Sequence, residues 1–312
     1  MKYVYVGLAA AAVLLLGGSF IVLRHVMPSR YRPDVVAGAT LIRVPDGQIR
    51  YELAGSGTET LLLLHGFQGN LNQWDPVWDR MGNCEVRRLR IDVPGFGDSR
   101  VDSRDYSLDA EGERIIRFLD ALDIPRVTLA GTSMGGSLAA WIAAKHPDRV
   151  SGLVLFAPSG YPGSLSYPGL FGMLVRPGPL NALATRIAGS DLYARIFPNS
   201  MAVETLTLTA SYGQAWRDAL PRIQAPTLIA WSAGDTTALP FAAEGVQRAI
   251  AGSALLMLDA TTRHSIPNSR PELAASILCS LARGADVRET VDESRQLLRM
   301  DEGLHPPQGR FK

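Results

Sequence analysis

The chain has 312 residues, of which 46% are hydrophobic and 20% are charged, which is enough for one large α/β domain with a substantial core. Lys and Arg together number 31 and Asp and Glu 30, so the net charge is near zero and no basic stripe suggests nucleic acid as a partner. The two cysteines, Cys84 and Cys279, have neither metal-ligand spacing nor a disulfide framework, and we interpret them as two partly buried thiols.

The N-terminal segment predicts a membrane helix. Tyr3–Leu23 is a run of 21 residues without a charge, which is long enough to span a bilayer. A cleavable signal peptide is the alternative, but its apolar region spans about 7–15 residues and ends at a small-x-small site, which this run lacks. Arg24, Arg30 and Arg32 follow the span and Lys2 alone precedes it, so the charge bias favours a cytoplasmic position for the rest of the chain.

Strand and helix patterns alternate over residues 35–283. Thr40–Val44 and Ile49–Leu53 flank a Pro-Asp-Gly turn and predict a β-hairpin. Apolar runs predict six further strands, several of them apolar on both faces: Leu61–Leu64, Arg87–Asp92, Val127–Ala130, Val150–Phe156, Thr227–Trp231 and Ala254–Leu258. The last core helix is expected at Pro271–Ala282. The predicted fold is therefore α/β, with a mostly parallel central sheet and helices on both faces.

The alternation breaks between about residues 159 and 221, in a stretch rich in Gly, Pro and aromatic residues that predicts a cap over the functional site. Its apolar side chains either line a pocket or simply pack the cap onto the core: Tyr161, Leu165, Tyr167, Leu170, Phe171, Met173, Leu174, Phe197, Tyr212 and Trp216. The outer segments are an anchor and linker at 1–34 and a charged, loosely ordered tail at 284–312 with one short helix at most. We assign no function to that tail.

Residues 131–135 read Gly-Thr-Ser-Met-Gly and lie between an apolar run and a helix-like stretch at 137–146. In this context the G-x-S-x-G pattern predicts a nucleophile elbow, a sharp strand-to-helix turn that exposes Ser133 while the glycines let helix and strand pack closely. A Gly-rich turn with an incidental serine is the alternative, and the partner residues argue against it.

A nucleophilic serine needs a base, and the chain has five histidines. Four of them lie where a different role is expected. His25 follows the apolar N-terminal run, His65 lies in a strand-turn segment, His146 ends a helix and His305 lies in the polar tail. His264 remains as the candidate base, because it follows a late strand on a short loop.

The imidazole should be oriented by a carboxylate at the end of another strand. Asp235 follows a short buried-strand pattern and precedes Pro240, so it fits this place, and the chain order is serine, aspartate, histidine. Asp259 is the competing acid, but it lies five residues before His264 at the same strand end, where the two side chains would face each other poorly. We favour Asp235.

Two backbone amides should form the oxyanion hole. One is the amide of Met134, directly after Ser133, and the other is expected from the turn after Leu61–Leu64, with Phe67 as the donor. We interpret His65, in the same turn, as structural.

With these residues assembled, the chain resembles the α/β-hydrolase superfamily, and more narrowly its membrane-anchored monoacylglycerol lipases and esterases. The resemblance spans roughly Ala37 to Leu281 and is carried by several motifs in order: His65–Phe67, Asp92–Ser99, Gly131–Gly136, His146–Val150, the Asp235 loop and His264. Arg263 departs from the pattern, because many relatives have glycine there. The serine at position 133 argues against the dehalogenase and epoxide-hydrolase branches, which use aspartate. The resemblance implies an α/β-hydrolase fold with a helical cap, here behind an N-terminal transmembrane helix.

These features predict a membrane-tethered serine hydrolase that cleaves carboxylic esters of lipid-like molecules such as monoacylglycerols. The predicted catalytic residues are Ser133, Asp235 and His264, and the predicted oxyanion donors are Phe67 and Met134. The expected partners are an apolar ester and the lipid bilayer, and no cofactor or metal is expected, since no metal-ligand cluster or phosphate-binding loop appears. A serine-dependent carbon–carbon bond hydrolase of aromatic degradation, similar at residues 133–136, stays open, as do a peroxidase-like or acyl-transfer reaction and a non-catalytic binding protein.

Overall fold

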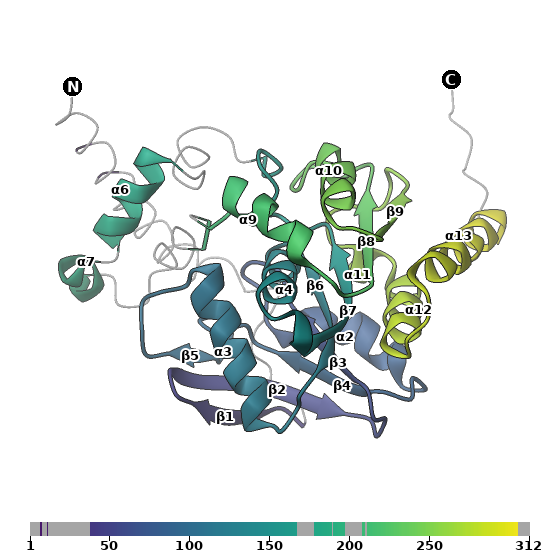
Figure 1. Ribbon diagram of the computed structural model, residues 1–312, viewed down its shortest axis with the longest axis horizontal. Coiled ribbons are helices and arrows are strands. Elements are labelled where there is room, and N and C mark those ends of the chain that lie inside the picture. Colours follow the sequence, from purple (N-terminus) through teal and green to yellow (C-terminus); the bar gives the residue numbers. More distant parts are fainter. Residues whose placement is uncertain are drawn as a thin grey trace.

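The computed structural model describes residues 38–166, 178–188, 190–196, 208–209 and 211–304, together with Gly7 and Ala11. Across these residues one nine-stranded sheet forms the centre of the domain, with helices on both faces (Figure 1). The strands are β1 (Thr40–Val44), β2 (Gly47–Ala54), β3 (Thr60–Leu64), β4 (Arg87–Ile91), β5 (Arg100–Val101), β6 (Val127–Thr132), β7 (Val150–Phe156), β8 (Thr227–Ser232) and β9 (Ala254–Leu258).

The order of the strands is β1-β2-β4-β3-β6-β7-β8-β9, and β5 pairs with β2. The β1–β2, β2–β4 and β2–β5 pairs are antiparallel, whereas all neighbours from β4 to β9 are parallel. The predicted hairpin and the six predicted strands are confirmed, with bounds that differ by at most two residues. Because parallel strands end at the same edge of a sheet, the loops after β3, β6, β8 and β9 all emerge at one edge.

The helices of the described residues lie on both faces of the sheet and in the segment between β7 and β8, which the sequence predicts to be a cap. They are α2 (Asp75–Trp78), α3 (Leu108–Ala121), α4 (Met134–Lys145), α6 (Pro179–Ala188), α7 (Asp191–Ile196), α9 (Gln214–Ala219), α10 (Phe241–Ala249), α11 (Ile266–Ser269), α12 (Pro271–Ala282) and α13 (Val287–Leu304). Short 3₁₀ helices are η1 (Leu71–Trp74), η2 (Asp79–Met81), η3 (Pro147–Arg149) and η4 (Leu220–Arg222).

The alternation of side chains along β3 shows how the two faces are covered. Every residue of this strand is buried. Leu62 and Leu64 pack with the buried residues of α3, α4 and α10, whereas Leu61 and Leu63 pack with those of α2, α12 and α13. Successive side chains of a strand point to opposite faces, so an uninterrupted apolar run is what a central strand between two helical layers requires.

The segment between β7 and β8 leaves the core and contains α6, α7 and α9 (Figure 1). The amide of Gly213 donates to the carbonyl of Gly160 at 2.9 Å, so the two ends of this insertion are joined by a hydrogen bond. Many of the apolar residues predicted to belong to the cap lie outside the described residues, namely Tyr167, Leu170, Phe171, Met173, Leu174 and Phe197.

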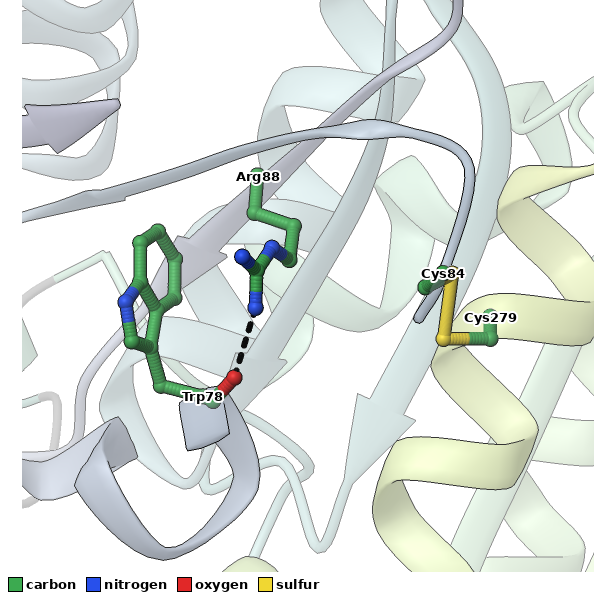
Figure 2. Close-up of a disulfide and its surroundings, with 4 residues drawn as sticks. All are labelled: Trp78, Cys84, Arg88 and Cys279. Carbon is green, nitrogen blue, oxygen red and sulfur yellow. Dashed lines mark hydrogen bonds between the residues drawn. A yellow bond between two sulfur atoms is a disulfide. The ribbon is translucent and has the colours of Figure 1, made fainter. Parts of the chain in front are cut away.

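A disulfide joins Cys84, in the segment before β4, to Cys279 on α12 (Figure 2). The interpretation of these residues as two free thiols is therefore wrong. The two Cα atoms are 5.8 Å apart, which is a normal span for a disulfide. Since 195 residues separate the two cysteines in sequence, only the packing of α12 beside η2 and α2 reveals the pair.

Two predictions concern the ends of the chain. The expected membrane helix Tyr3–Leu23 lies outside the described residues except for Gly7 and Ala11, and within the described part no helix is both long and apolar enough to cross a membrane. At the other end, α13 has 18 residues, where a short helix at most was expected. Its Val287 and Val291 are buried in the core cluster of α12, so this part of the tail packs against the domain.

Candidate active site

Ser133 lies in the sharp turn between β6 and α4. Its backbone has φ 53° and ψ −114°, a conformation that residues with a side chain rarely adopt. A Cβ atom on Gly131 would lie 2.2 Å from the Gly135 carbonyl oxygen, and one on Gly135 would lie 2.3 Å from that of Leu64. Both glycines are therefore required for α4 to approach β6 and β3 this closely, and this approach leaves the Ser133 side chain only half-buried.

Asp235 and His264 meet at the same edge of the sheet. Asp235 follows β8, its side chain is fully buried, and its Oδ2 lies 2.7 Å from Nδ1 of His264. Its Oδ1 accepts hydrogen bonds from the amides of Thr237 at 2.8 Å and Ala238 at 2.9 Å. These amides orient the carboxylate, and a ring that donates from Nδ1 to Asp235 has Nε2 available as an acceptor.

The structure brings Asp235 and His264 into contact and places Ser133 on the same sheet edge. In the sheet, β7 separates β6 from β8, and β9 lies beyond β8. Among the hydrogen bonds of the described residues, none joins the His264 ring to Ser133 Oγ. Catalytic hydrogen bonds are often long or poorly aligned in unliganded sites, so this geometry is compatible with His264 as the base.

Asp259, the competing acid, is engaged within its own loop. It accepts hydrogen bonds from the amides of Thr261 at 2.6 Å and Thr262 at 3.1 Å and from the Arg270 guanidinium at 3.1 Å. Burial raises the pKa of Asp259, but the hydrogen bonds from Thr261 and Thr262 and the charge of Arg270 outweigh it and lower this pKa to about 2. Asp259 thus anchors the loop that carries His264, and the ring itself contacts Asp235.

The turn after β3 lies beside the elbow because β3 is the neighbour of β6. The amide of Gly66 donates to Oε1 of Gln73 at 2.6 Å, and the amide of Gly69 donates to the Gly66 carbonyl at 3.0 Å. These bonds fix the backbone on both sides of Phe67, while Met134 is the first residue of α4. Sequence reasoning missed Gln73, since a polar residue in the short helix after the turn carries no signal of its own.

His65 connects this turn to the turn after β4 by hydrogen bonds. The ring is fully buried; its Nδ1 lies 2.7 Å from the Gly66 carbonyl, and its Nε2 accepts from the Val93 amide at 2.9 Å. Burial lowers the pKa of His65 below its ordinary value, although the nearby Asp92 charge opposes this. A neutral ring protonated on Nδ1 satisfies both contacts, so His65 has a structural role.

The motif at residues 92–99 is a scaffold for the same region. The buried Asp92 carboxylate accepts from the amides of Leu71 and Asp98, each at 2.7 Å. A Cβ atom on Gly97 would lie 2.2 Å from Asp92 Oδ2, so only glycine allows the turn to close over the carboxylate. This turn sets the position of the Val93 amide that donates to His65.

A hydrogen-bond network connects the cap to the helix behind Ser133. The Ser137 hydroxyl on α4 accepts from the amide of Ser159 at 2.9 Å, and Ser159 Oγ donates to the Tyr212 hydroxyl at 3.2 Å. The indole of the buried Trp216 donates to the Ser137 carbonyl at 2.9 Å. Tyr212 and Trp216 therefore fix the cap to the core.

A small, mainly apolar cavity lies beside Met134 and Tyr106. Its walls also include Val93, Phe96, Glu111, Leu138 and Leu208. Across the described part of the chain, no three His, Cys, Asp or Glu side chains are grouped as metal ligands.

Comparison with known proteins relates this arrangement to hydrolases. Residues 59–188 match the family model of the alpha/beta hydrolase fold. The chain is 36% identical over 126 residues to a 2-hydroxy-6-oxononadienedioate/2-hydroxy-6-oxononatrienedioate hydrolase of Paraburkholderia phymatum, over 39% of this chain and 42% of that protein. It is 35% identical over 112 residues to monoacylglycerol lipase abhd6-A of Xenopus laevis, over 35% of this chain and 32% of that protein. The chain thus spans less than half of the length of these two relatives.

Among solved structures, the chain is similar to a membrane phospholipase A described as a bacterial virulence factor. The TM-score is 0.62 and the sequence identity 26%, over 91% of this chain and the whole of that one.

Proposed function

Because the chain belongs to the α/β-hydrolase superfamily, we propose that it is a serine hydrolase that cleaves carboxylic esters of lipid-like molecules. The observation that carries the proposal is the 2.7 Å contact between Asp235 and His264, at the sheet edge where the Ser133 elbow emerges. Three side chains from the ends of three parallel strands then have the roles of acid, base and nucleophile.

In the proposed mechanism, Ser133 Oγ attacks the ester carbonyl carbon while Nε2 of His264 accepts the hydroxyl proton. Nδ1–H of the ring stays bonded to Asp235, whose charge stabilises the imidazolium. The amides of Phe67 and Met134 donate to the oxyanion, and Gln73 and His65 keep the first of these donors in place. His264 protonates the departing alcohol, and it then activates a water molecule that hydrolyses the acyl-enzyme.

The proposed lipid-like substrate rests on the expected N-terminal anchor and on the similar proteins. The expected N-terminal anchor would hold the domain at a bilayer, where monoacylglycerols and similar amphiphiles partition. The similar proteins include a monoacylglycerol lipase and a membrane phospholipase A.

The disulfide is informative about the side of the membrane on which the domain lies. Disulfides persist in oxidising compartments and are rare in the cytosol, so the Cys84–Cys279 bond supports an extracytoplasmic domain. The arginines after the anchor favour the opposite side, but long domains are translocated largely regardless of charge. We therefore propose that the domain lies on the oxidising side of the membrane. Protease added to intact spheroplasts that express the full chain should degrade the domain, and protection until lysis would instead support the cytoplasmic side.

The first experiment is labelling with a fluorophosphonate probe. We expect the wild type to be labelled and Ser133→Ala to be unlabelled and inactive on p-nitrophenyl esters and monoacylglycerols. Ser253→Ala is a matched control, because Ser253 is also half-buried but lies before β9, at the opposite end of the strands. Full esterase activity of purified Ser133→Ala would disprove the mechanism. A folded wild type that is never labelled would favour a binding protein with the hydrolase fold.

A carbon–carbon bond hydrolase is the second candidate, because the Paraburkholderia relative carries a dienedioate hydrolase name. The proposed anchor argues against it, since a soluble dienoate gives no reason for membrane tethering. Parallel assays of a ring-fission dienoate and a monoacylglycerol with the same purified protein would separate the two candidates.

A further inference from the structure

The loops that carry Asp235 and His264 both contact the buried hydroxyl of Ser232. We propose that Ser232 is a positioning residue, which holds the acid loop and the base loop in register. The inference rests on the proposed function, since it concerns the Asp235–His264 pair of that mechanism. Ser232 is the last residue of β8 and is fully buried.

The contacts of Ser232 reach into both loops. Its Oγ accepts from the amide of Gly234, the residue before Asp235, at 3.0 Å. It also lies within hydrogen-bond distance of two carbonyls of the base loop, those of Asp259, at 3.1 Å, and Thr262. A hydroxyl has one proton and two lone pairs, so it can donate to the base loop and accept from the acid loop at the same time.

A second contact shows how closely the two loops pack. A Cβ atom on Gly234 would lie 2.0 Å from the carbonyl oxygen of Ala260. Only a glycine therefore fits between the acid loop and the base loop at this point. The ladder pairing of β8 with β9 ends at Ser232 and Leu258. Beyond it the amide of Ala233 donates to the Leu258 carbonyl at 3.0 Å, and the contacts of Ser232 and Gly234 lie further into the two loops.

The base loop is itself a rigid partner for the hydroxyl. Arg270 donates to the carboxylate of Asp259 at 3.1 Å and to the hydroxyl of Thr262 at 3.3 Å. These bonds hold together the segment that presents both carbonyls to Ser232. A shift of Ser232 or its loss would therefore change the position of His264 relative to Asp235 and not merely loosen one residue.

The test is a double-mutant cycle between Ser232→Ala and Asp235→Asn, measured on an ester substrate. We expect Ser232→Ala to lower kcat by about 10- to 100-fold with KM unchanged, because misplacement by about 1 Å can cost this much. In the Asp235→Asn background the further loss should vanish, since the pair is already broken. An equal loss in both backgrounds, or no loss in the wild-type background, would overturn the inference.

Ser294→Ala is the matched control. Ser294 on α13 is equally buried and its hydroxyl also donates to a backbone carbonyl, that of Thr290 at 2.7 Å, but it is not part of the site. Ser294→Ala should lower the stability of the domain and leave kcat unchanged. A loss in kcat equal to that of Ser232→Ala would mean that replacing any buried serine has the same effect, and it would overturn the inference.

Ser232→Cys tests the same hydroxyl if Ser232→Ala does not fold, because a thiol fills the buried site but is a much weaker hydrogen-bonding group. It should lower kcat in the wild-type background and not in Asp235→Asn, and full activity of Ser232→Cys would contradict the inference. The outcome is separable from that of the proposed function. If Ser133 is labelled and wild-type hydrolysis depends on it, a normal Ser232→Ala enzyme overturns the positioning role alone, whereas hydrolysis independent of Ser133 overturns both.

Discussion

Removal of the Cys84–Cys279 disulfide is expected to destabilise the domain strongly. The bond joins residues 195 apart in sequence, and a cross-link restricts the unfolded chain more when the loop that it closes is longer. For a loop of this length the chain-entropy relation gives a contribution of roughly 5 kcal/mol to the free energy of unfolding. In a domain of this size, that corresponds to a fall of about 10–20 °C in Tm.

Thermal unfolding of the full chain, followed by circular dichroism with and without dithiothreitol, measures this effect. The wild type should lose stability on reduction, and the double variant Cys84→Ser/Cys279→Ser should unfold at the lower temperature under both conditions. Since the double variant has no thiol, any response of it to dithiothreitol would reveal an effect of the reagent alone. If thiol titration shows full reduction of the wild type and the Tm does not change, the reasoning from loop closure is refuted.

Three further predictions concern the site. Asp235→Asn should lower kcat by about 10⁴-fold, because the His264 ring would lose the partner that fixes its tautomer. Ester hydrolysis measures this effect. A loss in kcat below about tenfold would contradict the assignment of Asp235 as the acid. Gly131→Ala should lower the Tm far more than Gly152→Ala. A Cβ at Gly131 would lie 2.2 Å from a backbone oxygen, whereas one at Gly152 would have no neighbour closer than 3.4 Å. Equal effects of the two variants on the Tm would contradict the close approach of β6 and α4. The pKa of Asp259 is about 2 in the folded protein, below the value of about 3.9 for an unfolded aspartate, so its contribution to stability is present above about pH 4 and lost as the pH falls through about 2. Urea unfolding of Asp259→Asn should therefore depend less on pH across this window than that of the wild type, and identical pH profiles would exclude the role of Asp259.

The sheet could be predicted because its signal is local. A run such as Leu61–Leu64 is apolar on both faces, and a central parallel strand needs this pattern wherever its neighbours come from. The glycines around Ser133 are similarly informative, since each is dictated by backbone that lies within a few ångströms. His264 could be selected by elimination, because only five histidines are present.

The residues that sequence reasoning missed act across long separations. The hydroxyl of Ser232 meets carbonyls 27 and 30 residues further along the chain, and the two cysteines are 195 residues apart. No periodicity encodes such contacts, which exist only once β8, β9 and α12 have packed. The length of α13 was missed for a different reason. Its buried valines are spaced four residues apart, Val287 and Val291, but the charged composition around them is typical of a loosely ordered tail.

The hydrogen bond between Gly160 and Gly213 has a consequence for how this protein could change over evolution. The two ends of the insertion meet at this bond, and residues 164–166 of it also pair with residues 237–239 after β8. Doubling the length of a flexible loop costs only about 0.6 kcal/mol of closure entropy, so insertions in this segment away from these contacts should cost the fold little stability. Changes in the segment between Gly160 and Gly213 could therefore alter substrate preference, while the strand ends that hold Ser133, Asp235 and His264 stay as they are.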